Sequence, residues 1–147
     1  ALGVACRMLE DDRLLAGGGA THVALARRLR RFAESIPGRE QLGAEAFADA
    51  LEVIPRVLAE NAGLDPIDTL LKLVAQQVNG GEHAHHIGLD VLERQPQNMI
   101  ENGILEPYLI VRQSIAGATE AAISILRIDD VLWAKQDPSM PNIPEME

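Results

Sequence analysis

The chain has 147 residues and a mass of 15.9 kDa, which suits one domain with a core of its own. Its formal charge is −9, and an acidic surface repels phosphate backbones, so we expect no nucleic-acid partner. No apolar run reaches the roughly 18 residues of a membrane helix, and the N-terminus lacks a signal-peptide pattern. We therefore expect a cytoplasmic protein with no membrane partner. Its one cysteine, Cys6, excludes an internal disulfide and is expected in the core.

The expected helices in the first half of the chain follow apolar spacing and end signals. The first helix is expected over residues 2–12 and the second over residues 20–35, after a glycine triplet. The third is expected over residues 39–62, with Pro55 kinking it. The residues expected to face the core on the second and third helices are Leu25, Leu29, Phe32, Ile36, Phe47, Leu51, Ile54 and Leu58.

In the second half, Asp65 and Pro66 predict the start of a fourth helix that ends at residues 79–81. A short strand is expected over residues 87–91 and one helical turn over residues 97–102. Pro107 predicts the start of the last long helix, which runs to about residue 127. A closing strand is expected over residues 131–133. The residues expected to face the core on these helices are Ile67, Leu70, Leu71, Val74, Val78, Val111, Ile115, Ala118, Ala122 and Ile125.

Two features of the sequence suit ligand binding. Gly17, Gly18 and Gly19 precede a helix, where backbone amides attract anions and glycine permits close approach, but alone this is a weak signal and the residues favour a plain helix–helix turn. Glu106 stands at the expected start of the last helix, where its carboxylate either complements the helix dipole or accepts hydrogen bonds from sugar hydroxyls.

Two further clusters of polar residues favour a structural explanation over a ligand site. His83, His85 and His86 have a spacing that a metal site could use, but the neighbouring glycines favour a solvated loop. Four arginines on the second helix favour either a solvated polar face or an inter-subunit salt-bridged one, and acids such as Glu34, Glu40 and Glu45 could pair with them across helices. These arginines are Arg27, Arg28, Arg30 and Arg31.

Three stretches together resemble a known family. FADALEVIP occupies residues 47–55, LAENAGLDP follows at residues 58–66, and ILRIDD stands at residues 125–130. In this order they resemble the C-terminal part of a group II chaperonin subunit, the family of the archaeal thermosome and the eukaryotic cytosolic chaperonin. The resemblance extends over residues 1–134.

The resemblance implies a mainly α fold, the helical half of a chaperonin equatorial domain with one or two short β-strands. Residues 1–16 would end the intermediate domain and lead into the equatorial domain, residues 17–135 would form the C-terminal half of the equatorial domain, and residues 136–147 would be a disordered tail. Family members use ATP in a double ring of subunits that encloses unfolded proteins. The expected function is therefore a part of an ATP-dependent chaperone, with other chaperonin subunits and unfolded client proteins as partners.

The resemblance also implies a nucleotide site. The backbone of Gly17, Gly18 and Gly19 would line the pocket, and Glu106 would bind the ribose hydroxyls. The cofactor would be ATP or ADP with Mg, whose ligands lie mostly outside this sequence, so neither a metal ligand nor a catalytic residue is assigned here. The residues expected near the base are Asp90, Val91, Leu92 and Ile104.

By the same resemblance, the phosphate-binding loop, the catalytic aspartate and the apical client-binding domain lie outside these 147 residues. Because phosphoryl transfer depends on positioned metal and carboxylates, we expect no meaningful ATP hydrolysis from this chain alone. The alternative is a non-catalytic helical module, derived from a chaperonin, that self-assembles or binds a partner. A zinc-binding helical protein that uses the histidine loop is a weaker alternative.

Overall fold

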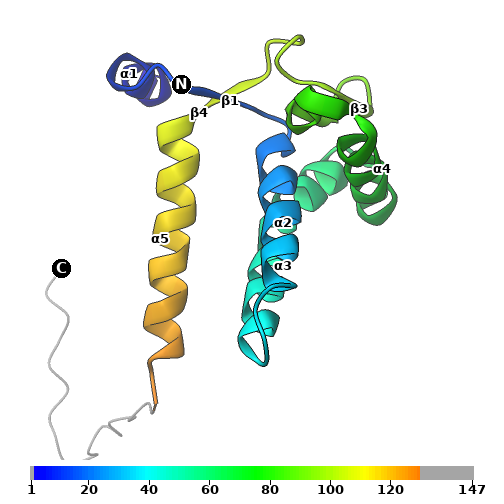
Figure 1. Ribbon diagram of the computed structural model, residues 1–147. Helices are drawn as coiled ribbons and strands as arrows, with labels where there is room; N and C mark the ends of the chain where they lie inside the picture. The colour runs from blue at the N-terminus through cyan, green and yellow to red at the C-terminus, as the bar shows by residue number, and fades with distance from the viewer. Residues whose placement is uncertain (1, 130–147) are drawn as a thin grey trace, which may run out of the picture. The chain divides into compact units, whose positions relative to one another are not determined.

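The computed structural model describes residues 2–129, which form two units, one ending at Arg112 and the other beginning at Gln113 (Figure 1). The mainly helical fold with a few short strands was predicted correctly. The elements are α1 (Leu2–Glu10), β1 (Leu14–Ala16), α2 (Ala20–Ala33), α3 (Glu40–Asn61), α4 (Pro66–Asn79), the 3₁₀ helix η1 (Gly81–His86), β2 (Ile87–Asp90), β3 (Gln95–Asn98), β4 (Leu105–Pro107) and α5 (Tyr108–Leu126).

Helices α2 and α3 form an antiparallel pair (Figure 1). Small side chains face the partner helix, and small side chains let two helices approach closely. The predicted stripes of large residues were therefore mostly wrong, because Phe32 is 59% exposed and Ile54 is 50% exposed. The buried hydrophobic residues of the pair are Ala20, Val23, Ala26, Ala33, Ala48, Leu51 and Ala59, all at most 9% exposed.

An ion pair with a buried carboxylate joins the two helices. Arg30 of α2 donates to both carboxylate oxygens of Glu52, at 2.8 Å for Oε2, and to Asp49 at 2.7 Å. Arg56 adds a contact to Glu52 at 3.3 Å. Glu52 is 3% exposed, and its carboxylate raises the pKa of the Arg30 guanidinium further.

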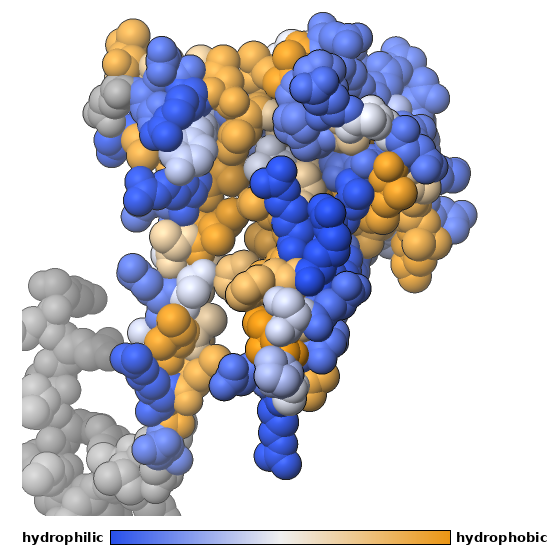
Figure 2. Space-filling view, viewed as in Figure 1, coloured by the Kyte–Doolittle hydropathy of each residue, from blue (hydrophilic) through white to orange (hydrophobic). Residues whose placement is uncertain are grey.

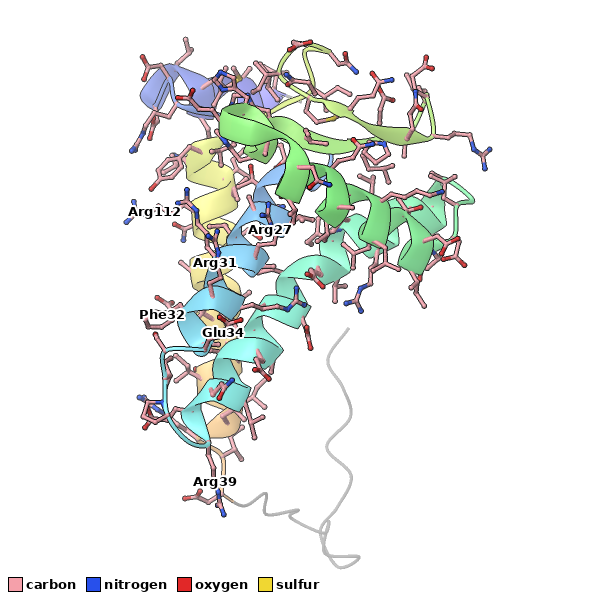
Figure 3. All side chains as sticks on the ribbon, turned by 45° about the vertical axis from the view of Figure 1, so that its right-hand side comes forward. Arg27, Arg31, Phe32, Glu34, Arg39 and Arg112 are labelled. Carbon is pink, nitrogen blue, oxygen red and sulfur yellow. The ribbon has the colours of Figure 1, made fainter. Side chains whose placement is uncertain are left out.

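The partners of the arginines thus differ from the predicted ones, since α3 supplies Glu52 and Asp49 in place of Glu34, Glu40 or Glu45. Figure 3 shows Arg27 and Arg31 on the ribbon of α2, where neither makes an ion pair with another described residue. Arg30 is therefore bridged to α3, whereas Arg28 and Arg31 are exposed and Arg27 is half-buried.

Helix α4 begins as predicted. The Asp65 carboxylate accepts hydrogen bonds from the backbone amides of Ile67 and Asp68, at 2.9 and 2.8 Å, and Pro66 occupies the first turn. Its buried face again differs from the predicted stripe. Leu73 and Gln77 are 0% and 2% exposed, whereas Ile67, Leu71 and Val78 are 67%, 62% and 59% exposed.

Two antiparallel strand pairs complete the first unit. Strand β1 pairs with β4, placing Leu15 opposite Glu106, and β2 pairs with β3. The sequence predicted β2 but missed the other three strands. Pro107 ends β4 rather than starting a helix, and the predicted helical turn over residues 97–102 overlaps the end of β3. The histidines, expected in a loop, lie in η1.

Helix α5 crosses the boundary between the two units and is mostly exposed. Val111 is buried, but Ala118 and Ala122 are exposed and Ile125 is 67% exposed, so most of its predicted inward face was wrong. Cys6 of α1 is exposed as well, against the prediction. Apolar side chains accordingly show on the surface between polar ones (Figure 2). The predicted strand at residues 131–133 and the tail lie outside the described residues.

Among the described residues, α5 is long and apolar enough to cross a membrane by length and composition alone. From the sequence, no stretch of this length and hydropathy was predicted. Only 6% of its most apolar window is buried. One such helix is weak support for a membrane protein, because core helices of soluble proteins meet the same length and composition.

Candidate functional site

The glycine triplet forms a tight junction between β1 and α2. Gly18 and Gly19 have φ values of +62° and +73°, which favour glycine. A Cβ on Gly18 would lie 2.6 Å from the Leu89 carbonyl oxygen, and one on Gly19 would lie 2.9 Å from Cβ of Pro55. The junction therefore holds β2 and α3 close to the backbone of the triplet.

Backbone hydrogen bonds fix this junction to the strands. The amide of Gly17 donates to the Ile104 carbonyl at 2.9 Å, and the Gly18 carbonyl accepts from the amide of Leu89 at 2.8 Å. Within the described part of the chain, the amides of Gly18 and Gly19 donate to no carbonyl. Two backbone donors thus remain available at the start of α2.

A pocket of about 410 Å³ opens beside this junction. It brings together residues from the triplet, α3, β2 and the approach to β4. Most of its wall is aliphatic, and its polar side chains are an amide and a carboxylate. The lining residues are Gly18, Gly19, Ile54, Val57, Leu58, Asn61, Leu89, Val91, Ile104 and Glu106.

Glu106 is the only charged side chain among the lining residues of this pocket. It is half-buried on β4, opposite Leu15. Its carboxylate makes no hydrogen bond or ion pair with the rest of residues 2–129. Its acceptor capacity is therefore free for a ligand with hydroxyl or amide donors.

Three predicted site residues do not line this pocket. Gly17 is buried behind the junction against Ile104. Leu92 is 89% exposed. The Asp90 carboxylate accepts hydrogen bonds from the amides of Glu93 and Leu92 and from the Asn102 side chain, at 3.2, 2.9 and 3.1 Å. These bonds, led by that from Glu93, lower the Asp90 pKa and give this carboxylate a turn-forming role.

Sequence reasoning missed the α3 wall of the pocket, together with Leu89 of β2. The signal was present, because residues 47–66 carry the family-like stretches and Pro55 stands within them. Ile54 and Leu58 were predicted to face the core, so they were not considered as pocket residues. Pro55 lies so close to Gly19 that a Cβ there would be 2.9 Å from Cβ of Pro55, and this face of α3 lies beside the site.

The histidines of η1 pack on one another. His86 stacks on His83 with ring centroids 5.3 Å apart, and His85 meets His86 edge-on at 4.2 Å. Burial and the two neighbouring imidazoles lower the pKa of His86. No group of three or more metal-ligating side chains converges anywhere in residues 2–129. His85 and His86 instead line a second cavity of about 240 Å³ with β1 and α2.

Comparison with known proteins gives consistent matches. The TCP-1/cpn60 chaperonin family matches residues 1–136. A thermosome subunit of Methanocaldococcus jannaschii is 56% identical over 137 residues, which cover 92% of this chain and 25% of that protein. The thermosome subunit beta of Thermoplasma acidophilum is 52% identical over 134 residues, covering 91% of this chain and 24% of that protein.

A solved structure agrees with these relatives. The open-state monomer of a group II chaperonin from Methanococcoides burtonii superposes with a TM-score of 0.78 at 45% identity, covering 86% of this chain and 31% of that chain. The chain thus spans about a quarter of the length of the curated relatives described above. It belongs to the TCP-1/cpn60 chaperonin family and represents part of a group II chaperonin subunit, as its sequence motifs predicted.

Proposed function

We propose that this chain supplies the adenine and ribose side of an ATP site in a chaperonin subunit. The observation that carries this proposal is the unpaired carboxylate of Glu106 in a mostly aliphatic pocket beside the glycine junction. The aliphatic wall suits a flat base, and the carboxylate suits the vicinal hydroxyls of a ribose. Val91 and Ile104 lie in the lining where the family resemblance expects contacts with the base.

The pocket also suggests which part of the nucleotide this chain binds and which part the rest of the subunit binds. Its lining contains no lysine or arginine, so the phosphates need positive charge from elsewhere. The free amides of Gly18 and Gly19 offer two donors at a helix start, which support an anion but do not replace a metal ion. We therefore propose that the phosphates and most Mg ligands are held by parts of the subunit beyond these residues, and that this chain alone binds nucleotide without hydrolysing it.

The wider role follows from the family and is proposed on that ground. The complete subunit would act in a ring of chaperonin subunits in the cytoplasm, use ATP, and assist the folding of unfolded proteins. Neither nucleic acid nor a membrane is proposed as a partner. The exposed apolar side chains of α2, α3 and α4 are consistent with surfaces that other parts of such an assembly cover.

The decisive experiment is calorimetric titration of the chain with ATP, ADP and adenosine. Glu106→Gln should weaken binding of all three about tenfold, because it removes a charge-assisted hydrogen bond. The matched control is Glu120→Gln, an exposed acid on α5. Equal affinities in the wild type and Glu106→Gln would refute the proposed site. Absence of any binding would favour the alternative of a non-catalytic interaction module.

A further inference from the structure

Gln77 of α4 carries a buried amide outside the lining of the pocket beside the glycine junction. It is 2% exposed and follows the fully buried Leu73 by one helical turn. Its Oε1 atom is buried and has no hydrogen-bond partner among the described residues. Burying an unpaired polar atom costs free energy, and an apolar side chain would fill the same space without that cost, so the amide has a role beyond packing.

That role lies in the two hydrogen bonds that the amide donates. Gln77 Nε2 donates to the Ala20 carbonyl at 3.0 Å and to the Ile87 carbonyl at 2.8 Å. Because both partners are acceptors, the nitrogen has to face them, and the oxygen could not take its place. Ala20 is the first residue of α2 and Ile87 is the first residue of β2. One side chain of α4 therefore joins the starts of two other elements.

The residues next to these two anchor points line the pocket. Gly18 and Gly19 precede Ala20 directly. Leu89 follows Ile87 by two residues, and its amide donates to the Gly18 carbonyl at 2.8 Å. Gly18, Gly19 and Leu89 all belong to the pocket lining. A shift of α2 against β2 would therefore move backbone that forms the pocket wall, and the hydrogen bonds of Gln77 oppose this shift.

We infer that Gln77 is a positioning residue for the nucleotide, acting through the backbone amides of Gly18 and Gly19 and through Leu89. This inference rests on the proposed function for its ligand. Within the described part of the chain the two glycine amides donate to no carbonyl, so they are available to a phosphate oxygen. Leu89 is part of the aliphatic wall that suits the base. A site that is held in its binding arrangement before the ligand arrives loses less free energy on ordering when the ligand binds.

A purely structural role for Gln77 makes a different prediction. Loss of a buried hydrogen bond lowers stability in either case, so unfolding measurements alone do not separate the two roles. A positioning role requires in addition that the nucleotide affinity of the folded chain falls. Leu73 provides the comparison, because it is buried on the same helix and its truncation destabilises the chain without removing a side-chain hydrogen bond to α2 or β2.

The first experiment is calorimetric titration of the chain with ADP and adenosine, at a temperature at which circular dichroism shows every variant folded. Gln77→Met keeps the length of the side chain and removes both donors. We expect it to bind ADP about tenfold and adenosine about threefold more weakly, because only ADP loses the glycine amides as well as the aliphatic wall. Gln76→Met, the same substitution at the exposed neighbouring residue, should keep both affinities, and so should Leu73→Ala.

The second experiment needs no variant, and it therefore applies even if Gln77→Met does not fold. Hydrogen exchange by NMR should show that the side-chain amide protons of Gln77 are protected from solvent, because they are buried and hydrogen-bonded. Coupling between two sites is reciprocal, so saturating ADP should slow this exchange by about the tenfold factor that the amide contributes to ADP affinity. The exposed side-chain amide of Gln76 should exchange fast with and without ADP.

The outcomes separate failure of this inference from failure of the proposed function. If the wild type binds ADP but Gln77→Met binds it equally well, or if Leu73→Ala weakens binding as much, Gln77 is only structural and the inference is overturned. Exchange of the Gln77 amide that is fast, or that ADP leaves unchanged, overturns it too. A wild type that binds neither ligand overturns the proposed function and with it the positioning of a nucleotide, whereas protected Gln77 protons would then still confirm the two hydrogen bonds.

Discussion

Glycine occurs both at the glycine junction, where neighbouring atoms pack closely against it, and in helix α5, where they do not. At the junction, Gly88 lies so close to its neighbours that a Cβ would be 2.5 Å from the Gly17 carbonyl oxygen. On α5, a Cβ on Gly117 would meet nothing within 4 Å. The first glycine is required by close packing, whereas the second only weakens a helix. Glycine content therefore reveals a site only when something packs against it.

The same contrast explains where large apolar residues lie. Near the junction, Met99 is fully buried against Ala16 and Ala20. On α5, Ile123 and Ile125 are 42% and 67% exposed although the sequence pattern predicted Ile125 to be buried. An amphipathic pattern predicts a face that can be buried, but another element has to cover it. Pairs of substitutions, one in each region, test whether packing by a neighbouring element accounts for this difference.

The largest expected effect comes from alanine at the two glycines. Gly88→Ala should destabilise the chain by more than about 3 kcal/mol, because the new Cβ meets backbone and Met99 that cannot move aside. Gly117→Ala should be neutral or stabilise α5 by about 0.5–1 kcal/mol through helix propensity. Urea unfolding followed by circular dichroism measures both. Equal losses of unfolding free energy at the two positions would contradict the conclusion that close packing requires only Gly88.

A comparable or smaller loss is expected when an aliphatic side chain is shortened. Leu73→Ala should cost about 2–5 kcal/mol, since Leu73 is fully buried and its removal leaves a cavity. Ile125→Ala should change stability by less than about 0.5 kcal/mol. Thermal melts of the two variants against the wild type test this difference. A marked loss from Ile125→Ala would show that α5 is covered in solution.

The smallest contrast compares two consecutive arginines of α2, one ion-paired with α3 and the other exposed. Arg30→Ala leaves the Glu52 carboxylate buried with only Arg56 nearby, and should cost about 1–2 kcal/mol, given that the Arg30 side chain is itself 38% exposed. Arg31→Ala removes an exposed guanidinium and should cost less than about 0.5 kcal/mol. Unfolding midpoints in urea distinguish them. Matching midpoints would mean that the Arg30–Glu52 pair adds no net stability.

Much of the local structure could be predicted from individual residues. Asp65 and Pro66 specified the start of α4 through a side-chain cap and a fixed φ, and Gly63 has the φ of +68° expected after a helix. These signals act within a few residues. The family-like stretches around Pro55 likewise identified the fold, and five of the predicted site residues lie in the lining of one pocket: Gly18, Gly19, Val91, Ile104 and Glu106.

The predictions that failed concern features that depend on contacts between residues far apart in the sequence. Strands β1 and β4 are three residues each and carry no period of their own, so only their pairing defines them. The buried face of α2 consists mainly of alanines, together with His22 and Val23, whereas the prediction followed the larger Leu25 and Phe32. The α3 wall of the pocket was missed because it is formed by a neighbour in space.

The pairing of β1 with β4 also has a kinetic consequence. This ladder joins residues 14–16 to residues 105–107, so it closes a loop that contains nearly the whole first unit. The entropy of closing so long a loop is lost before the contact yields any stabilisation, which makes such pairings late events in folding. Gly18 and Glu106 approach each other through this closure. A ligand that bridges the two would therefore bind the closed state alone, and its presence would slow the unzipping of these strands.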